Sequence, residues 1–421
     1  MDHVALAEFT RDPHPHFARA RQRSGLTYDP ELGAWLVARS SEVQEVLRRP
    51  EDFSSANVLQ PEVALAPETY AELGRGPGQG PIVVTSDGAV HRRLRAPHVR
   101  GLSTARVREV APFVRQRVQS LIDGFRDGHA EWMGAFARPL AQDVLGRVLG
   151  LAPADVPVAM RGTAALLELF QPASGPPARA GNDLPPHPRP PEQQVELARE
   201  VVATHHLLAD YVRHRSRDPR PDLCTELVHG LAANAQPPSA EQEGEIVANL
   251  VNLLIAGQVT TTAVLGTGLL HLLRHRDQWE RLCADVSRLP GAVEEILRYD
   301  TAIQGFRRVT TRAVTLAGVE LAAGDTVLVA FGSANRDVCG RGEEFDITRE
   351  PQRHFAFGHG AHGCPGAQLA RTQVYATLET VTTRLPGLRL VEPEPVPMLP
   401  SLMHRSPERL RVAWPTEANP A

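Results

Sequence analysis

Hydrophobic residues recur at intervals of three and four positions along most of the chain, which is the spacing of one face of an α-helix. The segments with this spacing are 41–49, 106–125, 140–149, 193–215 and 372–384. Strand-like runs are few and short, and they cover 34–38, 314–319 and 326–331. The pattern therefore predicts a mainly α protein with small peripheral β-sheets.

The longest predicted helix begins after Ser239 and continues to about Arg274. Ser239 and Gln242 have the spacing of a capping box, in which the two side chains satisfy each other's backbone N–H groups. At 1.5 Å per residue such a helix is about 45 Å long, enough to cross a domain. Its middle, residues 256–262, contains a glycine and three threonines, which are poor helix formers. This conflict between local preference and global pattern indicates a functional position.

A proline-rich segment separates two helical regions between residues 172 and 191. It contains eight prolines, which exclude a helix because proline lacks a backbone donor and clashes with the preceding turn. Such a segment can be a linker between domains or a loop that closes over a site within one domain. We favour the lid loop, because the helical pattern resumes at Gln193.

Composition changes this picture mainly by exclusion. All 45 basic residues are arginine, so a mechanism that needs lysine is excluded. Four cysteines in 421 residues are too few for a disulfide scaffold. The N-terminus lacks the pattern of a signal peptide, and we find no apolar stretch of the ~18–20 residues that span a bilayer. These observations predict a cytoplasmic protein without a membrane anchor.

The most basic part of the chain is residues 88–108, with six arginines and no acidic residue. A basic stripe of this kind can bind nucleic acid. The net charge of the whole chain is −4, however, and no nucleic-acid-binding motif accompanies the stripe. We therefore predict no nucleic-acid partner.

Most of the candidate chemistry lies in residues 354–366, where four glycines surround Cys364. A helix is expected to begin at about Pro365. A cysteine at a helix N-terminus is favoured as a thiolate, with a lowered pKa, because the helix dipole and the free N–H groups stabilise negative charge. Such a thiolate suits a metal ligand or a nucleophile. Two alternatives are an inert buried cysteine and a zinc site of His359, His362 and Cys364.

The pattern Phe-Gly-x-Gly-x-His-x-Cys-x-Gly from Phe357 to Gly366 resembles the complete haem-binding motif of the cytochrome P-450 superfamily. Four further elements match in family order: the His91–Arg95 element, the 256–261 segment, Glu295-x-x-Arg298 and Ala334-Asn335-Arg336-Asp337. The resemblance extends roughly from residue 53 to residue 414 and follows the soluble bacterial subtype. It implies the mainly α cytochrome P-450 fold, with residues 1–421 as one domain and haem buried in the core. On this basis residues 172–191 are a lid and not a linker.

The resemblance also implies roles for individual residues, with haem b as the cofactor. Cys364 is expected to be the iron ligand, and Phe357, Gly358, Gly366 and Ala256 are expected to pack around the porphyrin and the sulfur. The two haem propionates are anions that need polar partners at the edge of an apolar pocket. The residues expected to bind them are His91, Arg95, Arg308 and His362.

Thr260 is the residue expected to carry oxygen chemistry, because its hydroxyl can order a water that delivers protons. The same hydroxyl can bond back to the preceding turn and bend the helix, and the two roles can coexist. The family usually has an acidic residue just before this threonine, whereas this chain has Val259, preceded by Gln258. Valine cannot relay a proton. Either a substrate hydroxyl or amine completes the relay, or the reaction needs less proton delivery than hydroxylation does.

Two further groups of residues follow from the resemblance. Those expected to contact the substrate are Asn252, Ile255, Ala256, Ile303, Gln304, Leu402 and Met403. Because Asn252 and Gln304 are polar, we expect a substrate with hydrogen-bonding groups. Glu295 and Arg298 lie one helical turn apart, so they can form a pair, and their expected role is structural.

Together these features predict a haem-thiolate monooxygenase that oxidises a small organic substrate with dioxygen. The chain has no flavin or nicotinamide fingerprint, so a ferredoxin and a ferredoxin reductase are expected to supply the electrons. The ferredoxin is expected to dock on residues 88–108 in a salt-dependent way. The lysine-free, arginine-rich composition is typical of actinobacteria and favours tailoring of a secondary metabolite. The alternatives are oxidative cyclisation or aryl coupling without oxygen insertion, and a haem sensor or carrier without turnover.

Overall fold

Helices form most of this computed structural model, which describes residues 6–171, 184–232, 237–337, 341–391 and 394–416. The helices are α1 Leu6–Arg11, α2 His14–Gln22, α3 Ser40–Arg48, α4 Pro67–Leu73, α5 Gly88–Gly101, α6 Thr104–Asp123, α7 Arg138–Leu149, α8 Val156–Phe170, α9 Pro191–Arg217, α10 Leu223–Leu231, α11 Ala240–Arg274, α12 Arg276–Ala284, α13 Leu289–Tyr299, α14 Phe331–Asp337 and α15 Ala367–Arg384. Short helical turns are η1 Val83–Thr85, η2 Met133–Ala137, η3 Val286–Arg288 and η4 Gly360–His362.

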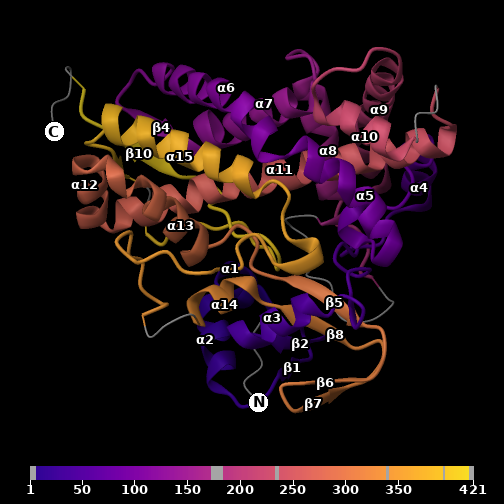
Figure 1. Ribbon diagram of the computed structural model, residues 1–421, viewed down its shortest axis with the longest axis horizontal. Helices are drawn as coiled ribbons and strands as arrows, with labels where there is room; N and C mark the ends of the chain where they lie inside the picture. Colours follow the sequence, from indigo (N-terminus) through magenta and orange to yellow (C-terminus); the bar gives the residue numbers. More distant parts are fainter. Residues whose placement is uncertain (1–5, 172–183, 233–236, 338–340, 392–393, 417–421) are drawn as a thin grey trace.

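Three small sheets lie at the edge of the helical body. Their strands are β1 Thr27–Asp29, β2 Ala34–Val37, β3 Phe53–Ser54, β4 His129–Glu131, β5 Phe306–Thr310, β6 Val314–Leu316, β7 Val319–Leu321, β8 Thr326–Val329, β9 Arg389–Leu390 and β10 Arg411–Ala413. The largest sheet has the order β1-β2-β8-β5-β3, and the others are β4-β10-β9 and β6-β7. In Figure 1 the largest sheet lies with α2, α3 and α14 at one end of the molecule, opposite α6 and α7. The predicted fold class, mainly α with peripheral sheets, is confirmed.

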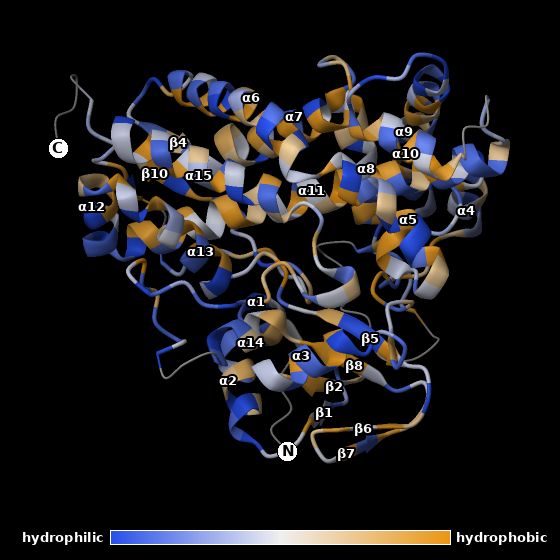
Figure 2. Cartoon of the chain, in the orientation of Figure 1, coloured by the Kyte–Doolittle hydropathy of each residue, from blue (hydrophilic) through white to orange (hydrophobic). Residues whose placement is uncertain are grey.

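The helices predicted from hydrophobic spacing are present as α3, α6, α7, α9, α11 and α15, with ends that differ by a few residues. Figure 2 shows hydrophobic and hydrophilic residues alternating along the helices, as amphipathic packing requires. Three predicted boundaries are wrong. Residues 314–319 form a hairpin and not one strand, because Ala317 and Gly318 have φ of 52° and 76° and turn the chain. Phe331 begins α14, and the helix after Cys364 begins at Ala367 and not at Pro365.

The long helix α11 has the predicted capping box. The Ser239 hydroxyl accepts from the Gln242 amide (3.2 Å), and the Gln242 side chain accepts from the Ser239 amide (2.9 Å). By length and composition α11 is apolar enough to cross a membrane, so the expectation that no stretch qualifies is wrong. Two thirds of its most apolar window is buried within the protein, as in a core helix. Leucines of α11 join those of α7, α10, α13 and α15 in the largest hydrophobic cluster.

The proline-rich segment lies partly outside the described residues, which resume at 184. Its described part packs against α8 and the chain before α4. His187 is buried and its Nε2 lies 3.0 Å from the carbonyl oxygen of Glu168. The Ala64 amide donates to Pro185 (2.8 Å), and the His187 amide donates to Ala64 (3.0 Å). These contacts connect the segment to two neighbouring parts of the molecule.

Candidate active site

Glycines shape the loop that contains Cys364. Gly358 and Gly360 have φ of 64° and 70°, a conformation that side chains disfavour. A Cβ at Gly360 would lie 2.5 Å from the carbonyl oxygen of Leu47 in α3, so the close approach of the loop to α3 requires glycine there. The Cys364 amide donates to the carbonyl oxygen of Phe357 (2.8 Å), which closes the loop.

The Cys364 thiol is exposed although it lies deep among protein atoms. Burial raises the pKa of the thiol, whereas the N–H groups of Gly366 and Ala367 and the charges of Arg95 and Arg371 lower it. Burial outweighs these groups, so the predicted lowering of the pKa is wrong for the polypeptide alone. The surrounding donors and cations stabilise a thiolate, and a positively charged partner at the sulfur would complete that stabilisation.

The zinc alternative is not supported. Among the described residues, no group of three or more His, Cys, Asp or Glu side chains is placed to hold a metal ion. The His359 ring instead lies 2.9 Å from the guanidinium of Arg353, and the His362 ring lies 3.0 Å from the hydroxyl of Ser55.

Four basic side chains predicted to act together do lie close to one another beside the cysteine loop. The rings of His91 and His362 are 4.0 Å apart, and Arg95 donates to the carbonyl oxygen of Gly363. The charge of Arg308 acts on the same group, because it helps to lower the pKa of His362, after burial and His91. We call His91, Arg95, Arg308 and His362 the basic cluster.

The basic cluster has one carboxylate beside it, Asp87, whose Oδ1 lies 3.5 Å from the Nε2 of His362. Arg308 is 5% exposed, yet the one hydrogen bond of its side chain to the described residues goes to the neighbouring carbonyl oxygen of Arg307 (2.8 Å). Burial lowers the pKa of Arg308 to about 10, and the charge of Asp87 acts in the opposite direction. His91 is 4% exposed, and its Nε2 has no hydrogen-bond partner among the described residues. Arg308 is a buried cation without an ion pair among the described residues, which is costly, so the cluster is suited to bind a further anion.

The middle of α11 forms an accessible strip within a buried helix. Asn252, Ile255, Val259 and Thr260 are half-buried and Ala256 is exposed, whereas the turns on either side are mostly buried. These positions are three or four residues apart, so they share one face of α11. The Thr260 hydroxyl donates to the carbonyl oxygen of Ala256 (2.7 Å), which is the back-bonding expected for this residue.

The other predicted substrate contacts divide into two groups. Ile303 pairs with His404, and the Gln304 amide donates to Met403 (2.7 Å), so the 303 and 403 segments lie side by side. Ile303, Met403 and Leu402 are half-buried. The Gln304 side chain differs, because it is 1% exposed and donates to the carbonyl oxygen of Thr301 (2.8 Å). In this structure it has no exposed surface for a substrate.

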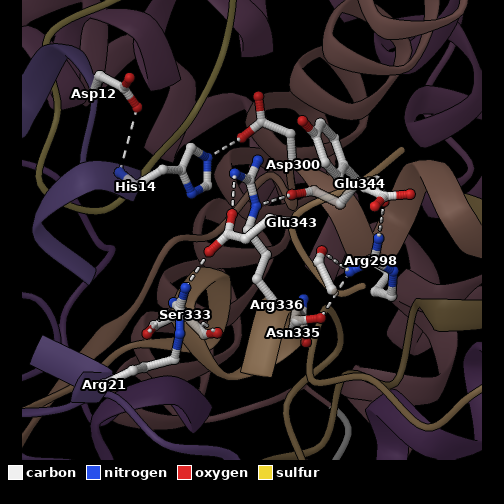
Figure 3. A network of polar contacts seen from close by, with 12 residues as sticks. Asp12, His14, Arg21, Arg298, Asp300, Ser333, Asn335, Arg336, Glu343 and Glu344 are labelled. Carbon is white, nitrogen blue, oxygen red and sulfur yellow. Dashed lines mark hydrogen bonds and ion pairs between the residues drawn. The ribbon is translucent and has the colours of Figure 1, made fainter. Parts of the chain in front are cut away.

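Glu295 and Arg298 form a pair that is 4% and 2% exposed and is fully bonded. Figure 3 shows Arg298 together with its partners Asn335 and Glu344. The guanidinium reaches both carboxylate oxygens (2.7 and 2.8 Å). Its remaining N–H groups donate to the carbonyl oxygens of Asn335, Gly342 and Glu344 at 2.8–2.9 Å. The pair therefore joins α13 to the chain around α14.

A second ion pair supports the cysteine loop from α13. Glu294 accepts from Arg371 of α15 (2.6 and 2.8 Å) and lies 3.0 Å from His354. Arg371 also lies over the ring of Phe357, 4.6 Å from its centre. Sequence reasoning missed Glu294, although its position beside the Glu-x-x-Arg motif was a usable signal.

Asn249 is another residue that sequence reasoning missed. It is fully buried in α11, where its side chain donates to Pro81 (3.0 Å) and accepts from the Val83 amide (3.1 Å). It thus fixes the chain that leads into α5 and His91. The available signal was an amide on the apolar side of α11, one turn before Asn252.

Comparisons with known proteins agree with this architecture. The family model described as Cytochrome P450 matches residues 34–406. A steroid C26-monooxygenase of Mycolicibacterium smegmatis is 31% identical over 389 residues, which cover 91% of this chain and 88% of that protein. A nocardicin C N-oxygenase of Nocardia uniformis is 31% identical over 429 residues, covering 98% and 97%. A solved structure of CxnD, a cytochrome P450 for C–S bond formation in chuangxinmycin biosynthesis, has a TM-score of 0.77, 29% identity and 96% coverage of both chains.

These matches extend over nearly the whole chain, and the relatives include named monooxygenases. The family implies a haem cofactor, a small-molecule substrate and a redox partner. The basic cluster and the accessible thiol fit a haem, since they offer unpartnered donors and a sulfur ligand. This chain belongs to the cytochrome P450 family.

Proposed function

We propose that this cytochrome P450 is a cytoplasmic monooxygenase that tailors a secondary metabolite by hydroxylation or another oxygen insertion. The observation that carries this proposal is the pairing of an accessible, deep thiol with a basic cluster in which buried Arg308 has no ion pair, and His91 Nε2 no hydrogen bond, among the described residues. A haem has a metal that the thiol can bind and two carboxylates that the basic cluster can bind. Relatives that include an N-oxygenase from Nocardia support an oxygen insertion.

In this proposal the cofactor is haem b, with Cys364 as the iron ligand and the basic cluster around the propionates. Phe357, Gly358, Gly366 and Ala256 would border the porphyrin. When bound, the haem supplies the activation of dioxygen. The protein surrounds it with apolar side chains and fixes its orientation through charge-assisted hydrogen bonds. Glu295 and Arg298 contribute by holding the chain beneath the loop in place.

Thr260 would handle protons at the accessible strip of α11. Its hydroxyl donates to Ala256 in this structure, so its oxygen is left as an acceptor for a water or a substrate donor. Val259 offers no proton, and the amide oxygen of Gln258 lies 3.5 Å from the hydroxyl of Thr163. The relay therefore depends on water or on a polar group of the substrate, which Asn252 can help to orient.

Carbon monoxide binding to the reduced holoenzyme tests the ligand assignment. A thiolate-ligated haem has a characteristic red-shifted absorption band in this state, which we expect for the native enzyme and not for Cys364→Ala. Haem retained with the native band in Cys364→Ala would exclude the assignment. Thr260→Ala should keep the band but divert electrons from product to peroxide, by about 10²-fold in the ratio of the two.

Oxidative cyclisation or coupling without oxygen insertion is a second candidate, favoured by the absence of an acid at Val259. The C–S bond formation named for CxnD supports it. A Val259→Glu variant distinguishes the two reactions. Efficient ¹⁸O incorporation from dioxygen by the native enzyme, with little peroxide, favours monooxygenation. A product without ¹⁸O, and a loss of that product in Val259→Glu, favours coupling.

A separate ferredoxin and its reductase would supply the electrons, with residues 1–421 acting as one domain and the 172–191 segment as a lid. The docking face would include the exposed side of α5. Arg92 is exposed there, whereas Arg100 is paired with Glu226 (3.1 Å). We therefore expect Arg92 to contribute more than Arg100 to the attraction of an acidic ferredoxin.

A further inference from the structure

A cavity of about 390 Å³ lies among residues that the proposed active site does not use. It is bordered by the α5–α6 junction, the end of α7, α9, the start of α10 and Leu369 of α15. Its volume is within the range of small-molecule sites in proteins. None of the residues assigned to the haem or the substrate lines it.

Arginine dominates the charged lining of this cavity. Arg106, Arg147, Arg215 and Arg220 line it, against two carboxylates, Glu109 and Asp222. The deepest pair is already neutral: Arg215 and Asp222 are 2.6 Å apart, with side chains 5% and 7% exposed. Asp222 also accepts from the Thr225 amide (2.9 Å) as the N-cap of α10. This pair forms part of the wall and has little capacity left for a ligand.

Among the other residues that line the cavity, three arginines, Arg106, Arg147 and Arg220, which we call the rim arginines, outnumber the one carboxylate, Glu109. The Arg147 side chain forms no ion pair or hydrogen bond with the described residues. Arg220 pairs with Asp218 (3.2 Å), but both side chains are more than half exposed, and such pairs are weak. Arg106 pairs with Glu109 (3.1 Å) and lies 3.9 Å from Glu226, which also pairs with Arg100. The N-termini of α6 and α10, which also border the cavity, add partial positive charge of the same sign.

The inner lining is apolar. Val107, Val148, Leu151, Leu223 and Leu369 are all less than 10% exposed and lie on the side of the cavity opposite to solvent. A ligand that fits both parts has an anionic head for the rim arginines and an apolar body for the interior. Inorganic anions would contact the rim arginines but not the apolar interior.

We propose that this cavity is a binding site for a small organic anion, a carboxylate or a phosphate monoester with an apolar body, and that Arg147 is its main contact. The proposal is independent of the reaction at the haem. Leu369 lies in the first turn of the helix that follows Cys364. An occupied cavity would therefore restrain the start of α15 and raise the thermal stability of the enzyme.

Isothermal titration calorimetry on the holoenzyme tests the proposal, with phenyl phosphate, benzoate and inorganic phosphate as probes in low-salt buffer. We expect phenyl phosphate or benzoate to bind more tightly than inorganic phosphate, with no shift of the haem absorption band. Arg147→Ala should weaken binding about tenfold, the loss expected for one charge-assisted hydrogen bond. Glu109→Gln, which removes a carboxylate from the rim, should strengthen it several-fold.

Arg108→Ala is the matched control, since Arg108 is an exposed arginine of α6 that does not line the cavity. Equal weakening in Arg108→Ala and Arg147→Ala would show general charge attraction and overturn the proposal. Binding that shifts the haem band would place the probe at the active site and overturn it as well. Inorganic phosphate binding as tightly as phenyl phosphate would refute the role of the apolar interior. The relative strength of the phenyl phosphate and benzoate arms identifies the head group.

Discussion

Two groups of buried arginines lie within the same molecule, and they differ in whether their hydrogen bonds are satisfied. Arg298 makes two bonds to Glu295 and three to backbone carbonyls. Arg308 is equally buried, yet its side chain has one bond to the neighbouring residue and no ion pair with any described residue. A buried charge must be compensated, and the protein itself compensates the charge of Arg298. The charge of Arg308 is compensated only when a ligand binds.

The largest effect should come from breaking the satisfied pair. Glu295→Ala leaves Arg298 as a buried charge without a counter-ion, which typically costs about 3–5 kcal/mol. We expect the unfolding free energy of both apoprotein and holoenzyme to fall by this amount, measured by urea denaturation. Equal stability of Glu295→Ala and the native protein would contradict the structural role of the pair.

Replacing Arg308, the arginine without an ion pair, should not destabilise the apoprotein. Arg308→Leu removes a desolvated charge, so we expect the apoprotein to be at least as stable as the native chain. Haem retention should fall roughly ten- to hundredfold, since a hydrogen bond to a charged group contributes about 1.5–3 kcal/mol. Haem transfer to apomyoglobin measures this rate. A less stable apoprotein with unchanged haem retention would reverse our assignment of the basic cluster.

A pH titration extends the comparison to the ion pair of Glu294 and Arg371. Burial acts to raise the pKa of Glu294, but the hydrogen bonds from Arg371 and His354 outweigh burial and lower the pKa to about 2. Between this value and the ordinary value of 4.5 the unfolded chain binds more protons than the folded one. Stability from Glu294 is therefore present above pH 4.5 and is lost as the pH falls toward 2.

Glu294→Gln should remove that part of the acid dependence and cost about 1 kcal/mol at neutral pH, since the pair is partly exposed. Unfolding in urea at several pH values between 3 and 7 measures both effects. If the unfolding free energy of the variant falls with decreasing pH as it does in the native protein, other carboxylates control acid unfolding. Asp346→Asn, which alters another carboxyl group near Arg349, serves as the comparison.

The smallest effect on stability is expected at the surface. Arg92→Glu should change the unfolding free energy by less than about 0.5 kcal/mol, because the side chain is exposed. The rate of reduction by an acidic ferredoxin should fall several-fold and lose part of its salt dependence. Stopped-flow reduction at increasing salt concentrations provides the measurement. A rate that does not depend on salt would exclude electrostatic docking on α5.

Much of the helical architecture was predictable because it depends on local spacing. The capping box of α11 and the amphipathic helices follow from contacts three or four residues apart. The failed boundaries have equally local causes that hydrophobic spacing does not contain, such as the positive φ of Ala317. The site was predictable only where a motif names its residues. Asn249 and Glu294 have no such motif.

The basic segment 88–108 shows what the sequence could not contain. It has no acidic residue of its own, but the fold brings Glu245 to Arg93 (2.5 Å) and Glu226 to Arg100 (3.1 Å). Both partners are more than 100 residues away along the chain. The true excess of positive charge on this face is therefore smaller than the sequence indicates.

The amino-acid sequence by itself determined the family, the cysteine loop and the order of the helices, since these depend on residue types at short, fixed spacing. Tertiary structure alone decided which buried charges are paired, that the Gln304 side chain is enclosed, and that burial raises the pKa of Cys364. The reason is that solvation and long-range pairing belong to the packed molecule. They depend on which distant segments exclude water from a group, and no local pattern records that.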